Sequence, residues 1–215
     1  MAELIGGPGD LIHNNYEVLL RKWQQQATSW NFRERYEAIG LSGYHENFPT
    51  ILYFGRRYVI DRSNGLITDA IQPERELTLS TWMNIYNLFY YSKERPKLSG
   101  RWVSFQDIPR TNVFTKAFFG QTVNPFAKIF SGRMPELIRA GEKLGFRRIA
   151  ASDVGFEADV FECLPIRFLF WDGDEEFSAN ANVLFDANVT DFVHAETVVT
   201  LASDGLQMLE KSADS

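Results

Sequence analysis

Cysteine is nearly absent from this chain of 215 residues, and its scarcity excludes several kinds of site. Cys163 is the one cysteine, so the chain forms no internal disulfide, and a single thiol cannot by itself hold zinc or an iron–sulfur cluster. Because Cys163 lies at the end of an expected strand, we interpret it as a buried structural residue.

Histidine is scarce too, and His13, His45 and His194 are too far apart for a helical metal motif. His194, close to Glu196, is the best functional candidate of the three, although a hydrogen-bonded histidine at a helix start is the simpler interpretation. No Gly-x-Ser-x-Gly turn is present, and the glycines at positions 6–9 follow no strand and lack the lysine of a phosphate loop. Nucleophilic catalysis and phosphate-loop chemistry therefore have no support.

Long apolar runs and an excess of basic residues are missing as well. No stretch approaches the length of a membrane span, and the first ten residues lack the basic start and apolar region of a signal peptide. The net charge is −6, which disfavours phosphate backbones and anionic headgroups, and the pairs Arg56-Arg57 and Arg147-Arg148 are too small to form a binding patch. We expect a cytoplasmic protein that binds neither nucleic acid nor membrane.

Aromatic residues, in contrast, are abundant: the chain holds 18 Phe, 8 Tyr and 5 Trp. Buried rings remove large apolar areas from water, so they either build a dense core or line an apolar cavity. A core is the simpler explanation, but the aromatic faces of two expected helices could also enclose a flat cofactor such as a tetrapyrrole. The candidate ligand-binding residues are Trp82, Tyr86, Phe118, Phe119 and Trp171.

The order of the sequence patterns predicts a single α+β domain, in which a small, mainly antiparallel sheet packs against several helices. Residues 1–12 are expected to form a flexible arm, and residues 13–215 the domain. Helices are expected from Asn14 or Asn15 to Ala27, over 32–39 and 78–91, across most of 113–145, and over 195–201 with a resumption after Gly205. Strands are expected over 50–54, 58–60 and 66–68 as a meander, then over 101–105, 159–163, 166–171 and 182–185.

The densest run of charge follows the strand pattern that ends at Trp171. Four carboxylates in five residues lie between Trp171 and Phe177, and a charged hairpin turn whose acids accept backbone N–H groups is the simplest interpretation. Such a density of oxygen atoms also suits a divalent cation, although the spacing is not that of an EF-hand, and a carboxylate pair could act as general acid and base. The candidate metal ligands are Asp172, Asp174, Glu175, Glu176 and Asp186.

Three segments carry a resemblance to a known family: Leu98-Ser-Gly-Arg-Trp-Val-Ser-Phe105, Pro165-Ile-Arg-Phe-Leu-Phe-Trp-Asp-Gly-Asp-Glu-Glu-Phe177 and Val183-Leu-Phe-Asp186. Together they resemble the signature of a prokaryotic family known as domain of unknown function 3786. The expected helices around Asn15-Tyr16-Glu17 and Leu88-Phe-Tyr-Tyr91 fit its layout, so the resemblance spans most of residues 14–201.

The resemblance implies a setting in anaerobic bacteria and archaea, where some relatives carry a cysteine-rich iron–sulfur segment beside this domain. It therefore implies a link to redox or corrinoid metabolism, with a redox or cofactor-handling protein as the partner. This chain departs from that pattern, because Cys163 alone cannot hold such a cluster. It also has Ser178-Ala179 where relatives tend to have a proline.

Three functions stay open on the sequence alone. The first is an accessory or ligand-binding module linked to anaerobic redox or tetrapyrrole metabolism. The second is a divalent-metal-dependent enzyme that uses the acidic run from Asp172 to Glu176. The third is a structural homodimer formed through exposed aromatic residues.

Overall fold

The computed structural model describes residues 8–215 of the chain, with side chains from Glu17 onward. Helix α1 (Pro8–Ala27) begins earlier than the predicted start at Asn14 or Asn15, since a proline is well accommodated in the first turn of a helix. Residues 8–12 of the expected arm are therefore helical, and residues 1–7 lie outside the described residues.

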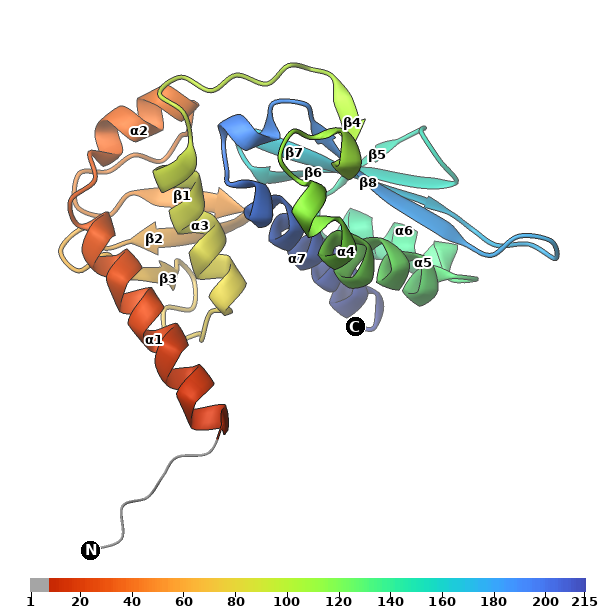
Figure 1. Ribbon diagram of the computed structural model, residues 1–215, viewed down its shortest axis with the longest axis horizontal. Coiled ribbons are helices and arrows are strands. Elements are labelled where there is room, and N and C mark those ends of the chain that lie inside the picture. The colour runs from red at the N-terminus through yellow and green to blue at the C-terminus, as the bar shows by residue number, and fades with distance from the viewer. Residues whose placement is uncertain (1–7) are drawn as a thin grey trace, which may run out of the picture.

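The N-terminal part of the chain forms a three-stranded antiparallel meander flanked by helices (Figure 1). Its elements are α2 (Phe32–Ile39), β1 (Thr50–Tyr53), β2 (Arg56–Ile60), β3 (Ile67–Asp69) and α3 (Leu79–Tyr91). The predicted meander and both predicted helices are confirmed. The sequence sets the ends of these helices: Asn31 and Thr78 accept N–H groups of the first turns, and Gly40 ends α2 with φ of 70°.

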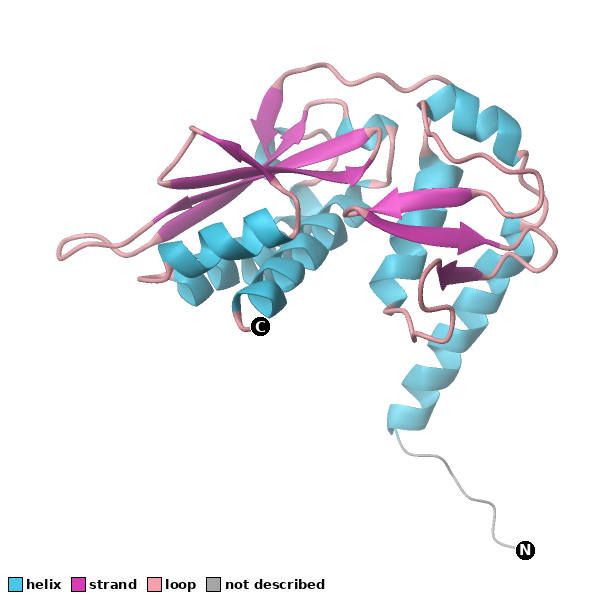
Figure 2. Ribbon diagram, turned by 180° about the vertical axis from the view of Figure 1, so that it is seen from behind, coloured by secondary structure: helices cyan, strands magenta, loops and turns pink. Residues whose placement is uncertain are grey.

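The C-terminal part forms a five-stranded antiparallel sheet in the order β4-β8-β7-β6-β5, with helices below one face (Figures 1 and 2). Its strands are β4 (Trp102–Ser104), β5 (Arg147–Ile149), β6 (Val154–Phe161), β7 (Leu164–Trp171) and β8 (Asn180–Asp186). Its helical segments are η1 (Phe105–Asp107), η2 (Asn112–Phe114), α4 (Thr115–Phe118), η3 (Phe119–Val123), α5 (Asn124–Phe130), α6 (Met134–Lys143), η4 (Val189–Asp191) and α7 (Ala195–Ala213).

In this part, the prediction misplaces one turn and misses one strand. The turn between β6 and β7 falls at Glu162-Cys163 and not at Leu164-Pro165, because Pro165 enters the strand beside a register irregularity between Asp159 and Phe161. A proline fits a sheet at such a position, near a strand start where no ladder hydrogen bond is lost. Strand β5 has no counterpart in the prediction.

Helix α7 runs without a break through Gly205, where the prediction placed an interruption. The glycine allows the helix to approach the sheet closely: a Cβ atom there would lie 2.5 Å from Cζ of Phe168 and 3.0 Å from Cζ of Phe54. Close packing against the sheet therefore outweighs the weak helix propensity of glycine.

One continuous hydrophobic core connects the two sheets, and the predicted single α+β domain is confirmed. The sheets meet where the backbone N–H of Phe54 donates to the carbonyl of Val160, at 2.9 Å. The alternation predicted for β7 is also confirmed, since Phe168 and Phe170 are buried on the helix-covered face and Arg167 points to the other. Within residues 8–215, no helix is long and apolar enough to cross a bilayer.

Candidate functional site

A large cleft lies where the β1–β2 turn faces helices α6 and α7. Its volume is about 860 Å³, inside the range of roughly 300–1,000 Å³ that is usual for small-molecule sites. We call it the cationic cleft, after its charged border, and its charged lining residues are Arg56, Arg57, Arg75, Lys143, Lys211, Glu76 and Asp204. Its apolar lining residues include Leu52, Phe54, Tyr58, Ile71, Leu77, Leu144 and Met208.

A tight turn places two of the arginines at this cleft. Phe54 and Gly55 both have positive φ, 49° and 74°, which is the backbone twist that joins two strands through a two-residue hairpin. The conformation is uncommon for a bulky residue, and it is held because the Phe54 side chain is buried against the neighbouring sheet. The chain then leaves the turn with Arg56 and Arg57 at the cleft.

The buried carboxylate of Asp69 fixes the loop on the opposite side of the cleft. It accepts the backbone N–H groups of Ile71 and Gln72, at 2.9 and 3.1 Å, and pairs with Arg56. Burial acts to raise the pKa of Asp69, but Arg56 and the two amides outweigh it and hold the pKa below its ordinary value. The loop after β3 is thereby locked, and the side chain of Ile71, 81% exposed, stays at the rim of the cleft.

A second buried carboxylate, Asp204 of α7, lies at the floor of the cleft. It accepts hydrogen bonds from the Tyr53 hydroxyl at 2.6 Å and from Nδ2 of Asn84 at 3.1 Å. The hydroxyl of Thr200 donates to Oδ1 of Asn84 at 2.6 Å, so α3 and α7 are joined by a chain of buried polar groups. Such groups are stable in a core when each has its partner.

The environment of Asp204 makes its charged form more costly than it is in water. Burial raises the pKa of Asp204 above its ordinary value, although the hydrogen bonds from Tyr53, Ser80 and Asn84 and the charge of Lys211 oppose the shift. The pKa of Tyr53 is raised too, first by burial and then by the charge of Asp204 and the hydrogen bond that Tyr53 donates to Asp204. A carboxyl group with a raised pKa in a cleft is a recognised mark of a functional site.

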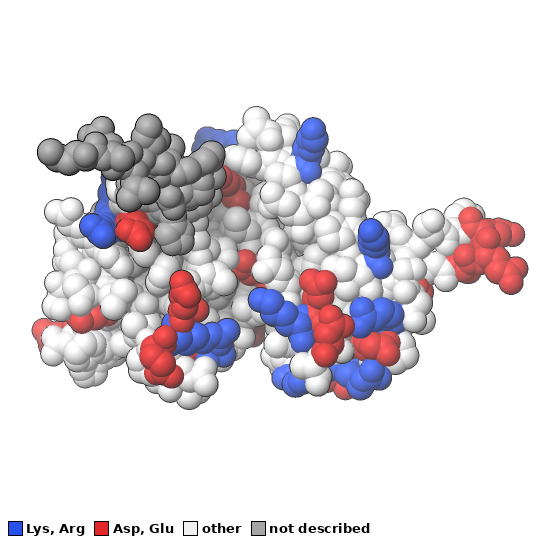
Figure 3. Space-filling model, turned by 90° about the horizontal axis from the view of Figure 1, so that it is seen from below, with Lys and Arg blue, Asp and Glu red and all other residues white. Residues whose placement is uncertain are grey.

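The border of the cleft is positive in a chain whose net charge is −6. The five basic residues come from β2, the loop after β3, α6 and α7, and Figure 3 shows basic side chains on both sides of the hollow. Arg56 and Arg75 are within reach of Asp69, whereas the ion pairs found among residues 17–215 do not include Arg57, Lys143 or Lys211. Lys143 Nζ donates to the hydroxyl of Ser215 at 2.7 Å, so Arg57 and Lys211 are the charges most open to a ligand.

The structure brings together three of the five aromatic residues predicted to bind a ligand, and at a different place. Phe118, Phe119 and Trp171 border a smaller cavity of about 290 Å³ beside β8. Trp82 and Tyr86 instead fasten α3 to the meander: Trp82 Nε1 donates to the carbonyl of Ile67 at 3.2 Å, and the Tyr86 hydroxyl donates to that of Gly65 at 2.7 Å.

The predicted metal ligands do not form one group. Residues 172–176 occupy the turn between β7 and β8, visible in Figure 3 as an acidic cluster at one end of the molecule. Asp186 lies at the far end of β8, about 20 Å away along the strand, where it accepts the backbone N–H groups of Ser99 and Gly100. Among the described residues, no group of three or more His, Cys, Asp or Glu side chains is placed to hold a metal ion.

Within the acidic turn, the first two carboxylates bond to the backbone. Oδ1 of Asp172 accepts the N–H groups of Gly132 and Gly173, and Oδ1 of Asp174 accepts those of Glu176 and Phe177, all at 2.8–2.9 Å. These contacts are what a structural hairpin turn requires. The hypothesis of a divalent-metal-dependent enzyme stays a prediction.

The remaining candidates have structural contacts. His194 caps α7, where its Nδ1 accepts the backbone N–H of Glu196 at 3.3 Å, as the simpler interpretation predicts. His45 accepts the amides of Asn47 and Phe48 in a loop, and the side chain of His13 lies outside the described side chains. Cys163 is half-buried in the β6–β7 turn, and burial raises the pKa of its thiol to about 12, which keeps it protonated at neutral pH.

The family model for a domain of unknown function, DUF3786, matches residues 31–208. This chain belongs to the DUF3786 family. The resemblance seen in the sequence is therefore confirmed at the level of the family. No curated protein and no solved structure matches the chain, so the function of this DUF3786 domain has to be inferred from its own geometry.

Sequence reasoning missed the cationic cleft of this DUF3786 domain because its charges are dispersed along the chain. In the sequence, Arg56-Arg57 is only a pair of arginines, too small to bind a polyanion. One signal was present: Asp204 interrupts the apolar stripe of a helix between Leu201 and Leu206, and a charged residue there must be paired or functional.

Proposed function

We propose that this DUF3786 domain is a cytoplasmic binding module that holds an amphipathic organic anion in the cationic cleft. The observation that supports the proposal is the convergence of five basic side chains from four separate segments on one cleft of an otherwise acidic protein. Positive potential concentrated in a cleft attracts an anion and raises its local concentration.

The apolar lining favours an anion with a hydrophobic body over a small inorganic ion. Leu77, Leu144 and Met208 offer aliphatic surface inside the cleft, and Ile71 adds an exposed aliphatic side chain at the rim. A ligand that covers these residues gains from their removal from water, while its acidic group meets Arg57 and Lys211. Carboxylates with a long alkyl or fused-ring body have this chemistry, and a tetrapyrrole with acidic side chains is one member of the class.

A panel of probe compounds tests the proposal through ligand-induced stabilisation. The purified protein is heated with decanoate or haemin, and with decanol as the uncharged counterpart of decanoate. A ligand that binds the native state raises the unfolding midpoint. We expect an acidic probe to raise the midpoint and decanol to leave it unchanged at the same concentration.

Charge reversal locates the binding in the cleft. The double variant Arg57→Glu/Lys211→Glu should weaken the probe that binds by about tenfold or more, since each reversal removes an attraction of about 1 kcal/mol. The matched control, Lys116→Glu/Lys128→Glu, makes the same change of net charge at exposed positions outside the cleft. Equal binding by both double variants, or no response to any acidic probe, would overturn the proposal.

A further inference from the structure

Strand β8 is longer than the strand that borders it. β4 pairs only with its C-terminal half, from Trp102↔Asp186 to Ser104↔Leu184, and the chain then turns away from the sheet into η1. Within the described part of the chain, no strand continues along β8 past Ser104. Residues 180–183 therefore form a free edge of the five-stranded sheet.

The direction of the backbone amides along this edge follows from the hydrogen bonds of β4. The N–H of Ala187 donates to the carbonyl of Arg101 at 2.9 Å, and Phe185 pairs with Val103. Amides alternate between the two sides of a strand, so the N–H groups of Ala181 and Val183 face the free edge, away from β7.

Each of these two amides is covered by a local side chain. The N–H groups of Ala181 and Val183 donate to Oδ1 of the preceding residues, Asn180 and Asn182, both at 2.8 Å. Each asparagine oxygen occupies the place that the carbonyl of a neighbouring strand would take. Strand pairing requires both side chains to rotate away, and Asn182 then gives up the hydrogen bond from its Nδ2 to Oγ of Ser104, at 3.3 Å. This arrangement protects an edge from unspecific pairing without closing it permanently.

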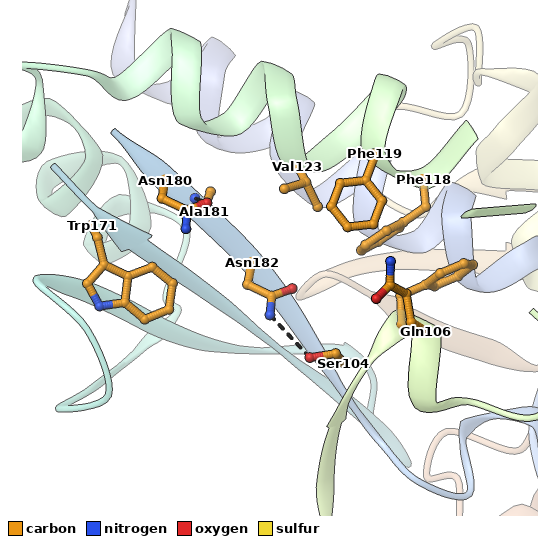
Figure 4. A pocket seen from close by; sticks show the side chains of 10 residues that line it. Ser104, Gln106, Phe118, Phe119, Val123, Trp171, Asn180, Ala181 and Asn182 are labelled. Carbon is orange, nitrogen blue, oxygen red and sulfur yellow. Dashed lines mark hydrogen bonds between the residues drawn. The ribbon is translucent and has the colours of Figure 1, made fainter. Parts of the chain in front are cut away.

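The cavity of about 290 Å³ opens along this same edge (Figure 4). Phe119 and Val123 of η3 form its second wall, and Ser104 and Gln106 lie at its end. η3 is a π-helix, a rare conformation that often marks functional positions. None of the residues that line the cavity is charged.

We propose that an uncharged, extended segment of a partner protein adds to this edge as a further strand of the sheet. The two edge amides lie about 7 Å apart, the two-residue repeat of an extended chain, and pairing through the main chain is a known mode of peptide recognition. Side chains on one face of the added strand enter the cavity against Phe119 and Val123. This site is separate from the cationic cleft, and its occupancy does not depend on the anion proposal.

A selection of peptides tests the inference. A phage-displayed library of random nonapeptides is selected on the immobilised protein, and enriched peptides are synthesised and titrated. The variant Ala181→Pro removes one edge N–H while leaving the amides that pair with β7, and it should weaken these peptides by about tenfold or more, the size of one lost main-chain hydrogen bond. Ser178→Pro, in the same hairpin but outside the edge, should bind as the parent does.

Two further measurements separate the inference from its alternatives. The variant Phe119→Ala shortens the opposite wall and should weaken the peptides too, and the thermal midpoint of each variant shows whether it folds. Amide hydrogen exchange at Ala181 and Val183 should slow when a selected peptide is added. The inference fails if no peptide is enriched, if Ala181→Pro binds as the parent does, or if only small aromatic compounds occupy the cavity.

Discussion

The acidic turn and the cationic cleft each gather several charges, and they differ in how these charges are assembled. The turn collects its carboxylates within five consecutive residues, and most of them are exposed to water. The cleft collects its basic groups from four segments between Arg56 and Lys211, around two buried carboxylates. The acids of the turn are close together in the sequence and lie mostly in solvent. The basic residues of the cleft are far apart in the sequence, and the fold brings them together.

This difference decides which region is the better candidate site. In the turn, Asp172 and Asp174 accept backbone amides and so stabilise the hairpin itself. In the cleft, Asp204 is held in a protein environment that raises its pKa, beside basic groups and apolar surface. The cleft has two buried carboxylates, Asp69 and Asp204, beside basic side chains that are mostly exposed, whereas none of the acids in the turn is buried.

Glycine substitutions should show the largest contrast in stability between the regions. Gly205→Ala, beside the floor of the cleft, pushes a methyl group against the rings of Phe168 and Phe54 and should cost about 1–3 kcal/mol of unfolding free energy. Gly173→Ala, in the turn, meets the backbone of Ala179 at 2.8 Å, but an exposed hairpin can shift and its cost should be smaller. Urea denaturation of both variants measures the difference, and equal costs would show that the cleft relaxes as easily as the turn.

Asp204→Asn should stabilise the protein by about 1 kcal/mol at pH 7, since asparagine keeps an acceptor for Tyr53 without burying a charge. The pKa of Asp204 is raised in the folded state, so the stability it contributes is complete below its ordinary value of about 3.9 and is lost as the pH rises through the folded pKa. The advantage of the variant should therefore grow from pH 4 to pH 7 in urea titrations. A constant difference would mean that Asp204 is not responsible.

Asp174→Asn should have the smallest effect, with the opposite sign. The N–H groups of Phe177 and Glu176 lower the pKa of Asp174, so its contribution is present above its ordinary value and is lost as the pH falls through the folded pKa. Thermal unfolding should show the variant slightly less stable than the parent at pH 7 and equal to it in acid.

The same thermal scan with magnesium, manganese, calcium and zinc tests the metal hypothesis. The hypothesis gains support if an ion stabilises the parent and not the variant.

Much of the fold could be predicted because local patterns dictate it. Asn31 and Gly40 mark the ends of α2, the period-two pattern gives the meander, and the alternation along β7 assigns its two faces. The acidic turn was likewise recognised as a turn, because aspartates that bond to nearby amides act over only two or three residues.

The sequence by itself thus determined the α+β class, the meander, most of the helices and the family. Only the tertiary structure decided that Phe118, Phe119 and Trp171 share one cavity, that Asp186 lies far from the acidic turn, and that Arg57 and Lys211 border the same cleft. Helix ends, turns and strand faces depend on residues a few positions apart. A cleft and a free sheet edge depend on which distant segments pack together, and no local pattern records that choice.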